Sequence, residues 1–386
     1  MTEPASLKVM TIVGTRPEVI KLSQVVAELE RHTDHRLVHS GQNYDHGLNQ
    51  VFFEELGIRQ PDHFLDAVGA TVAESIGLVI ARADRVMEAE RPDAVLLYGD
   101  TNTCLAVIAA RRRRIPVFHL EAGNRCFDDR VPEEINRRLV DHLSDVNLPL
   151  SEHARRYLLA EGLRPETVFK VGSPMKEVLR HHWAGIERSD VLGRLSLSPG
   201  RYLLVSAHRE ENVDVPAKLG QLVEGLRALA GRHRVPVVVS THPRTRARLA
   251  TAGLDGEADE RIRWLPPFGY LDWVQLERHA RCVVSDSGTL TEEASLLGFP
   301  AVMIRDAHER PEGMDEGVLV VSGLRPDRVL AAVGTVTRQH ADAGRPPVRV
   351  VPDYDVDGVA QKVVRIILSY VPYVNRTVWS DPSGER

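Results

Sequence analysis

The chain has 386 residues, of which 43% are hydrophobic and 27% are charged, and its net charge at pH 7 is −5. This length suits two domains rather than one hydrophobic core, and the weakly negative charge excludes an overall basic field that would hold nucleic acid. Because no apolar run approaches the roughly 20 residues that span a bilayer, and the first residues lack a signal-peptide pattern, we expect a cytoplasmic protein without a membrane partner.

Strand and helix patterns alternate through the first half of the chain. Apolar residues spaced by about 3.6 predict a helix over residues 17–31, and a further helix begins at Pro132. Short apolar runs that end in polar residues or glycine predict strands over residues 8–14, 36–41, 93–100, 116–123, 146–151 and 168–174. This alternation is typical of a mostly parallel sheet with helices on both faces.

The alternation breaks at a polar stretch between residues 181 and 200 and then starts again. The second half predicts strands over residues 202–209, 235–243, 262–267, 282–288, 300–306 and 317–323, and helices over residues 216–233, 290–298 and 355–370. We therefore expect an α/β protein whose two β/α domains face a cleft, the first over residues 1–185 and the second over residues 186–370.

Six of the predicted strands end in polar residues, in the stretches TRPE, GDT, EAG, AHRE, THPRT and DSGT. Ligands of open α/β sheets bind at the carboxyl ends of the strands. Six polar strand ends from two domains would converge on one cleft. One polar strand end alone would not indicate a site. The six strand ends therefore predict a binding site.

Two of these strand ends resemble anion sites. In GTRPEVIKL, Arg16 stands beside a predicted helix N-terminus with Lys21 one turn later, although a capped surface turn would give the same pattern. In SDSGTLTEE, Gly288 would let a diphosphate approach the backbone and Glu293 suits ribose hydroxyls, although an N-capped helix with acidic first-turn residues is the structural alternative. No GxGxxG or Walker A motif is present, which argues against NAD and phosphate-loop NTPase sites.

Acidic residues gather in the stretch HLEAGNRCFDDRVPEEINRR. Glu121 directly follows a predicted buried strand, where an ionised carboxylate needs a partner or a proton, and Asp100 follows the neighbouring strand. Desolvated carboxylates can act as acid or base. Glu133 also admits a structural reading, because it fits the first turn of a helix stabilised by ion pairs. That helix carries an apolar stripe at Ile135, Leu139 and Leu143.

Metal and disulfide chemistry are not indicated. The cysteines are Cys104, Cys126 and Cys282, and none forms a CxxC pair. Asp100, His119 and Glu121 match no metal-ligand spacing, so we expect no metal and no cofactor. His208 in SAHREENV is a site candidate, although a strand-end histidine can also be satisfied within a core.

The chain resembles the non-hydrolysing UDP-N-acetylglucosamine 2-epimerase family over nearly its whole length. The resemblance is carried, in order, by GTRPEVIKL, GDTNT, HLEAGNR, PEEINRR, SAHREEN, DSGTLTEE and RDAHERPE. It implies two Rossmann-like domains of glycosyltransferase-B type, a homodimer, and a C-terminal segment over residues 371–386 that crosses back to the first domain. It also implies a UDP-binding second domain and an isomerase.

The resemblance implies interconversion of UDP-GlcNAc and UDP-ManNAc by elimination of UDP to 2-acetamidoglucal and re-addition, without NAD or metal. Motif matching makes Asp100, Glu121 and Glu133 the acid/base candidates, and which of them is the base stays open. Arg16 and His208 would hold or protonate the leaving diphosphate. The substrate-binding candidates are Lys21, His242, Phe268, Ser287, Gly288, Thr289, Glu293 and Arg310, with phosphate assigned to residues 287–289, ribose to Glu293 and uracil to Phe268.

Some features depart from the family pattern. Asn43 in GQNYDHGLNQ replaces a histidine that contributes to a regulatory second substrate site in many bacterial members, so that regulation is in doubt. NRCFDDRVPEEINRR resembles the subgroup that acts on UDP-2-acetamido-2,6-dideoxy-L-talose to give UDP-N-acetyl-L-fucosamine. This 6-deoxy sugar is the alternative substrate. A glycosyltransferase, a hydrolysing epimerase and a nucleotide-sugar sensor are the alternatives from other classes.

Overall fold

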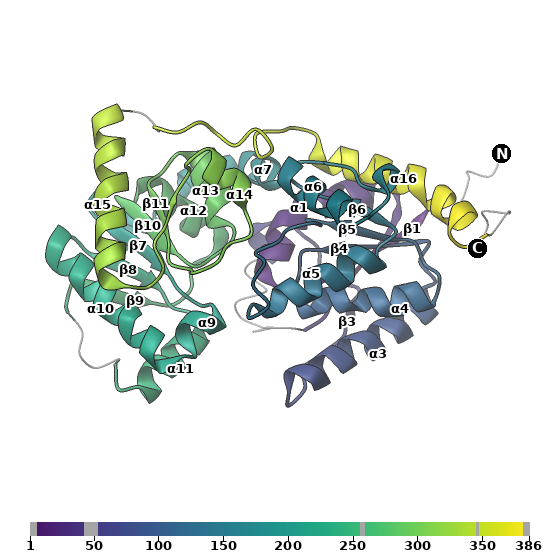
Figure 1. Ribbon diagram of the computed structural model, residues 1–386, viewed down its shortest axis with the longest axis horizontal. Coiled ribbons are helices and arrows are strands. Elements are labelled where there is room, and N and C mark those ends of the chain that lie inside the picture. The colour runs from purple at the N-terminus through teal and green to yellow at the C-terminus, as the bar shows by residue number, and fades with distance from the viewer. Residues whose placement is uncertain (1–5, 42–52, 255–258, 345–346, 381–386) are drawn as a thin grey trace. The chain divides into compact units, whose positions relative to one another are not determined.

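The structure is a computed structural model that describes residues 6–41, 53–254, 259–344 and 347–380. The chain divides into two compact units, one formed by Met1–Arg180 with Asp353–Arg386 and the other by His181–Pro352. Each unit is built on its own six-stranded parallel sheet (Figure 1). The stretch GQNYDHGLNQ, where a family motif departs, lies almost wholly outside the described residues.

The sheet of the first unit has the strand order β3-β2-β1-β4-β5-β6. Its strands are β1 Lys8–Val13, β2 Asp34–His39, β3 His63–Phe64, β4 Ala94–Tyr98, β5 Val117–Leu120 and β6 Val146–Leu148. The chain leaves β1 toward β2 on one side and returns to β4 on the other. The carboxyl ends of β1 and β4 therefore flank the topological switch point, where ligands of doubly wound sheets bind.

Helices cover both faces of this sheet because its strands are apolar on both sides. All five residues of β4 are buried. Helices α3 Val72–Glu90, α4 Val107–Arg112 and α5 Pro132–Leu143 lie on one side, and α1 Arg16–His32, α6 Glu152–Ala160 and α16 Val359–Thr377 lie on the other (Figure 1). Met10, Ile12, Val95 and Leu97 pack in one core cluster with apolar side chains of α3 and α4. This burial on both faces is what parallel sheets require.

The second unit repeats the same topology, with strand order β12-β11-β10-β7-β8-β9. Its strands are β7 Leu203–Ser206, β8 Val237–Ser240, β9 Ile262–Leu265, β10 Cys282–Ser285, β11 Ala301–Met303 and β12 Val320–Val321. Its helices are α8 Val191–Arg194, α9 Glu210–Val213, α10 Pro216–His233, α11 Pro243–Thr251, α12 Tyr270–His279, α13 Leu290–Leu297, α14 Pro311–Asp315 and α15 Pro326–Ala343. The switch point lies between β7 and β10.

The strand predicted over residues 168–174 is wrong. Val168 makes one isolated parallel bridge with Asn147, and no strand follows it. The backbone turns away at Gly172, whose φ is +90°, and the N–H of Ser173 donates to the carbonyl of Asp353 at 3.0 Å. Val168 is therefore buried against Ala122 and Leu158, and the returning segment around Asp353 and Val356 contacts Gly172 and Ser173.

The division between the units also differs from the predicted ranges 186–370 and 371–386. Residues from Asp353 onward belong to the first unit, and helix α16 packs along α1 there. The carboxylate of Glu177 accepts from the N–H of Val359 at 2.7 Å and of Ala360 at 3.1 Å, which satisfies the first turn of α16. The chain thus returns to the first unit earlier than the resemblance implied. The other boundary lies inside α7 Met175–Arg188, between Arg180 and His181.

Among the described residues, no helix is long and apolar enough to cross a membrane.

Candidate active site

The turn between β1 and α1 approaches its neighbours closely. A Cβ on Gly14 would lie 2.0 Å from Oγ1 of Thr103 and 2.3 Å from Oγ of Ser40, so only glycine fits without a shift. The carboxylate of Glu18 accepts from the N–H of Gly14 at 2.5 Å and of Thr15 at 3.2 Å. These contacts close the first turn of α1 and hold the loop that carries Arg16.

Glu18 also connects this turn to the end of β4. Its other oxygen accepts from the hydroxyl of Thr101 at 2.6 Å, next to Asp100. Burial raises the pKa of Glu18 from 4.5 to about 7 against the lowering effect of these hydrogen bonds, and the charge of Asp100 adds to the rise. The sequence analysis did not single out Glu18, because a capping-box glutamate is indistinguishable by pattern from an ordinary helix start.

Glu121 has its partner in Lys21. The ammonium of Lys21 lies 2.8 Å from Oε2 of Glu121, and the Tyr98 hydroxyl donates to the same oxygen at 2.5 Å. The side chains of Lys21 and Glu121 are 2% and 10% exposed. The residue itself sits at φ +67°, a left-handed conformation that a non-glycine residue adopts at a cost. The sequence analysis expected a partner for the desolvated Glu121. That partner is Lys21, which the sequence analysis had instead placed at an anion site.

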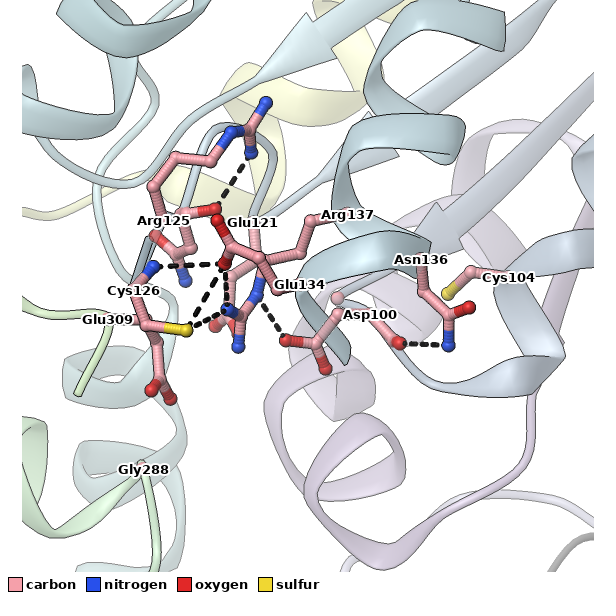
Figure 2. A network of polar contacts seen from close by, with 12 residues as sticks. Asp100, Cys104, Glu121, Arg125, Cys126, Glu134, Asn136, Arg137, Gly288 and Glu309 are labelled. Atoms are coloured by element: carbon pink, nitrogen blue, oxygen red, sulfur yellow. Dashed lines mark hydrogen bonds and ion pairs between the residues drawn. The ribbon is translucent and has the colours of Figure 1, made fainter. Parts of the chain in front are cut away.

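Asp100 lies in a second charged cluster, at the carboxyl end of β4 (Figure 2). Nε of Arg137 donates to Oδ2 of Asp100 at 2.8 Å, and the same guanidinium donates to Glu134 at 2.8 Å. Glu134 also accepts from the N–H of Cys126 at 2.9 Å. Burial opposes ionisation of Glu134, but its hydrogen bonds with Cys126 and the charge of Arg137 leave the pKa of Glu134 below its ordinary value. Arg137 therefore aligns Asp100 from helix α5.

A fully buried network lies behind both carboxylates. The His119 ring contacts the carbonyl of Gly99 at 2.7 Å and Asp141 at 2.8 Å. Asp141 accepts from the N–H of Gly123 at 3.2 Å and from Arg125 at 2.7 Å. Gly99 precedes Asp100, and Gly123 is two residues after Glu121. This network therefore holds the backbone beside each carboxylate and explains why His119, a tempting metal ligand in the sequence, is occupied.

The buried face of α5 carries charged side chains as well as Val140. Glu134, Arg137 and Asp141 are buried there, whereas Ile135 and Leu139 are 53% and 45% exposed. Ile135 and Leu139 of the apolar stripe read from the sequence are therefore exposed, whereas Leu143 packs against the core of the first unit. Glu133 lies in the first turn of the same helix and is half-buried.

In the second unit, Asp286 organises the loop after β7. Its carboxylate accepts from the N–H groups of His208 at 3.1 Å and Arg209 at 3.0 Å, and from the amide of Asn212 at 3.1 Å. Nδ1 of His208 lies 3.3 Å from Asp286. Burial of the ring by the surrounding protein lowers the pKa of His208, and the attraction of the Asp286 charge only partly offsets this effect. The aspartate of DSGT thus positions a strand-end histidine.

A small pocket of about 130 Å³ lies at the carboxyl ends of β7 and β10. Its walls include Ser206, His208, Glu277, Ser287, Thr289 and Glu293. The hydroxyls of Ser287 and Thr289 lie 3.0 Å apart, and Thr289 donates to Glu293 at 3.1 Å. Four predicted residues therefore meet in one pocket at the switch point.

Arg310 and Gly288 lie next to each other. Nε of Arg310 donates to the carbonyl of Gly288 at 3.0 Å, and its guanidinium pairs with the fully buried Glu292 at 3.1 Å. A Cβ on Gly288 would lie 2.7 Å from Oε1 of Glu309. A side chain at this position would therefore meet the carboxylate of Glu309, whereas the approach of a diphosphate to Gly288 stays a prediction.

The other predicted site residues lie elsewhere in the two units. Arg16 begins α1, and His242 caps α11 by accepting from the N–H of Arg244 at 3.3 Å. Phe268 follows β9 and is half-buried. Neither His242 nor Phe268 lines the pocket at β7 and β10. Glu277 does line it, yet its place in the last turn of α12 gives no sequence signal.

Comparison with known proteins decides the family. The sequence model of the UDP-N-acetylglucosamine 2-epimerase family matches residues 27–368. This chain belongs to that family. The UDP-N-acetylglucosamine 2-epimerase of Rickettsia bellii has a solved structure that is 54% identical, with a TM-score of 0.90 over 97% of this chain and 100% of that one.

Two further relatives extend the comparison. The structure of Methanocaldococcus jannaschii UDP-GlcNAc 2-epimerase in complex with UDP-GlcNAc and UDP is 32% identical, with a TM-score of 0.88 over 94% of this chain and 100% of that one. The UDP-2,3-diacetamido-2,3-dideoxy-D-glucuronate 2-epimerase of Pseudomonas aeruginosa is 35% identical over 85% of this chain and 92% of its own length. The predicted family, isomerase class and two-domain α/β fold of glycosyltransferase-B type are confirmed.

The described residues contain no group of three or more His, Cys, Asp or Glu side chains arranged to hold a metal ion. All three cysteines are free thiols.

Proposed function

We propose that this protein interconverts UDP-GlcNAc and UDP-ManNAc by inverting C2 of the sugar. The observation that carries the proposal is the family match over residues 27–368, which includes every strand end described above except that of β1. The relatives named for this reaction support the substrate. In this reading the first unit supplies the proton-transfer groups and the second unit supplies the nucleotide site.

The carboxylates of the first unit suit proton transfer at C2. A base removes the C2 proton while the C1–O bond to UDP breaks and its electron pair leaves with the diphosphate, so that a C1=C2 double bond forms. UDP then adds back at C1 as an acid delivers a proton to the opposite face of C2. Two acid/base groups on opposite faces are needed, and Asp100, Glu121 and Glu133 are our candidates.

The environments of two of these candidates differ in a useful way. Glu121 pairs with Lys21 and accepts a hydrogen bond from Tyr98, and its side chain is 10% exposed. Asp100 pairs with Arg137, and its side chain is 22% exposed. Both are held by fixed cations, so neither side chain needs to reorganise when a proton moves. The protons of Lys21 and Tyr98 can in turn compensate the charge on Glu121 as it changes.

The pocket of the second unit suits the nucleotide. We assign Ser287, Gly288 and Thr289 to phosphate oxygens, Glu293 to the ribose hydroxyls and Arg310 to the diphosphate or the sugar. Hydroxyl and backbone donors at the end of β10 are the groups that bind anions at a switch point. His208, held by Asp286, is our candidate to protonate or hold the leaving diphosphate.

We further propose that the protein is a homodimer. Ile135 and Leu139 on α5 are exposed apolar side chains of the first unit, and contiguous exposed apolar side chains mark association surfaces. Sedimentation velocity of the wild type and of Ile135→Lys tests this. A wild-type monomer at micromolar concentration would contradict the proposal.

Proton NMR of the purified protein with UDP-GlcNAc in D2O, without added metal or NAD, tests the function. Deuterium at C2 together with UDP-ManNAc signals would support it, because reversible removal of the C2 proton exchanges it with solvent. Release of free sugar and UDP would instead indicate a hydrolysing enzyme. Bound UDP-GlcNAc without any exchange would contradict the proposed substrate.

One observation favours a second candidate substrate. The Pseudomonas relative is named for a diacetamido-glucuronate sugar, and its identity of 35% over 334 residues equals that of the curated Methanocaldococcus jannaschii 2-epimerase. The identity to these two relatives therefore does not distinguish their two sugars. Running the same exchange measurement with UDP-2,3-diacetamido-2,3-dideoxy-D-glucuronate separates the two. None of the relatives reported above is named for the 6-deoxy sugar.

A further inference from the structure

Glu277 is a buried carboxyl that the proposed reaction leaves without a role. It lies in helix α12, which ends in front of β10, and it is completely inaccessible to solvent. It lines the pocket at the ends of β7 and β10 together with Glu293. Burying a carboxyl group in this way costs free energy unless a partner or a proton neutralises it.

Within the described part of the chain, no cation is paired with Glu277. Neither of its oxygens has a hydrogen-bond partner of good geometry among the described residues, although the Trp273 indole and the carboxyl of Glu293 are its neighbours. Tyr202 and Tyr270 are the other titratable groups near it, and the Tyr202 hydroxyl is already used by the carbonyl of Leu276 at 2.5 Å. The arginine that follows on α12, Arg278, instead lies over the ring of Trp183 at 4.2 Å.

Glu277 and Glu293 line the same buried pocket, where two ionised carboxylates repel each other. Like charges at this range raise the pKa of one member, and burial raises it further. Burial and the charge of Glu293 accordingly place the pKa of Glu277 well above its ordinary value. The two groups then hold one proton between them, and the pair titrates as a unit.

We propose that Glu277 is a positioning residue of the nucleotide site, which as a neutral carboxylic acid donates a hydrogen bond to Glu293. Glu293 is thereby kept ionised and fixed, with Thr289 on one oxygen at 3.1 Å and room for a ribose hydroxyl from the pocket. This inference rests on the proposed function in one respect, namely that the pocket binds the ribose of UDP. The sharing of the proton itself depends only on the pair.

UDP binding as a function of pH tests the proposal by calorimetry. From pH 7 to pH 9 the wild type should lose about tenfold in affinity for UDP beyond any loss seen in Glu277→Gln, whose amide donates to Glu293 without titrating. Titration of UDP itself is common to both proteins. The exposed Glu224→Gln is the matched control and should follow the wild type.

A second variant separates positioning from packing. Glu277→Leu keeps the bulk but cannot donate, so it should bind UDP about tenfold more weakly at pH 7, while its affinity for 2′-deoxy-UDP should change less. Rescue by glutamine but not by leucine supports the proposal. Equal losses in the two variants, or equal effects on both nucleotides, would overturn it.

Thermal unfolding without UDP tests the shared proton separately from the proposed function. Sharing a proton predicts that Glu277→Gln gains stability relative to the wild type as the pH rises from 6 to 9, because only the wild type must ionise a buried acid or take up a proton. Parallel melting curves would overturn the shared proton. Absence of UDP binding by the wild type at every pH, with this stability difference intact, would contradict the proposed function instead.

Discussion

At the scale of single residues, two acid/base candidates of the first unit are each paired with a cation. Lys21 serves Glu121 and Arg137 serves Asp100, both at 2.8 Å. Such pairing fixes orientation more than it adds stability, because the desolvation of each ion offsets much of the attraction. The residues are therefore best tested by turnover rather than by stability.

Glu121→Gln keeps the shape of the side chain and can still accept from Tyr98, but it cannot take up a proton. We expect turnover to fall by about two orders of magnitude or more, with UDP affinity nearly unchanged. Steady-state rates and UDP calorimetry measure the two quantities. The exposed Glu166→Gln serves as control, and near-normal turnover of Glu121→Gln would remove Glu121 from the acid/base candidates.

Glu18 makes stability depend on pH. Its pKa is raised by burial to about 7 in the folded protein, so its contribution is complete below its ordinary pKa of 4.5 and is lost as the pH rises through about 7. Glu18→Gln does not titrate, so the stability of the wild type relative to this variant should fall by about 3 kcal/mol between pH 4.5 and pH 7.5. Urea unfolding at both pH values measures it, and a constant difference would contradict the raised pKa.

At the scale of elements, Asp100, Glu121 and His208 each lie where a parallel strand gives way to a turn. The turn after β1 needs a glycine because Thr103 and Ser40 press against it, and the turn after β5 forces Glu121 to φ +67°. The buried His119–Asp141 pair contacts Gly99 and Gly123 and so holds the turns after β4 and β5 in place. These local arrangements depend on neighbours that are distant in the chain.

Two glycine substitutions test this dependence. Gly14→Ala should destabilise the protein by more than 1 kcal/mol, because its Cβ would lie 2.0 Å from Thr103. Gly220→Ala on helix α10 meets nothing within 4 Å and should stabilise by about 0.5–1 kcal/mol, since alanine is the better helix former. Denaturant unfolding of both variants measures the contrast. Equal effects would refute the close approach at Gly14.

At the scale of the whole molecule, the chain builds two units that each bury a core of their own. The first unit is completed only when residues after Pro352 add helix α16, whose Val363, Ile367 and Val374 are fully buried. The first unit is therefore discontinuous in sequence. Its stability therefore depends on a segment that is far from its other residues in the sequence.

Ile367→Ala should create a cavity in the first unit alone and cost about 2–5 kcal/mol there. Leu226→Ala, in the core cluster of the second unit, is the matched change. Calorimetry with UDP present should show the UDP-stabilised transition shifted only by Leu226→Ala, because UDP is assigned to the second unit. Loss of that stabilised transition in Ile367→Ala would contradict the assignment of helix α16 to the first unit.

The sequence by itself determined the class of the fold and the family. Strand and helix periodicity follows from local geometry, and motifs such as GTRPE and DSGT mark strand ends because the turn chemistry is local. It also led to Asp100 and Glu121, since an acid after a buried strand has few structural uses. The strand predicted over residues 168–174 was wrong, because an apolar run indicates that a segment is buried but not which other element buries it.

Only the tertiary structure decided how these residues are paired. Lys21 and Glu121 are 100 positions apart, and Arg137 reaches Asp100 across 37, so no spacing rule could connect them. Glu277 meets Glu293 through two helices that are separate in the chain. The exposed stripe on α5 and the return of α16 are likewise set by packing between distant segments. Charge compensation, burial and chain return are long-range properties, which local patterns do not encode.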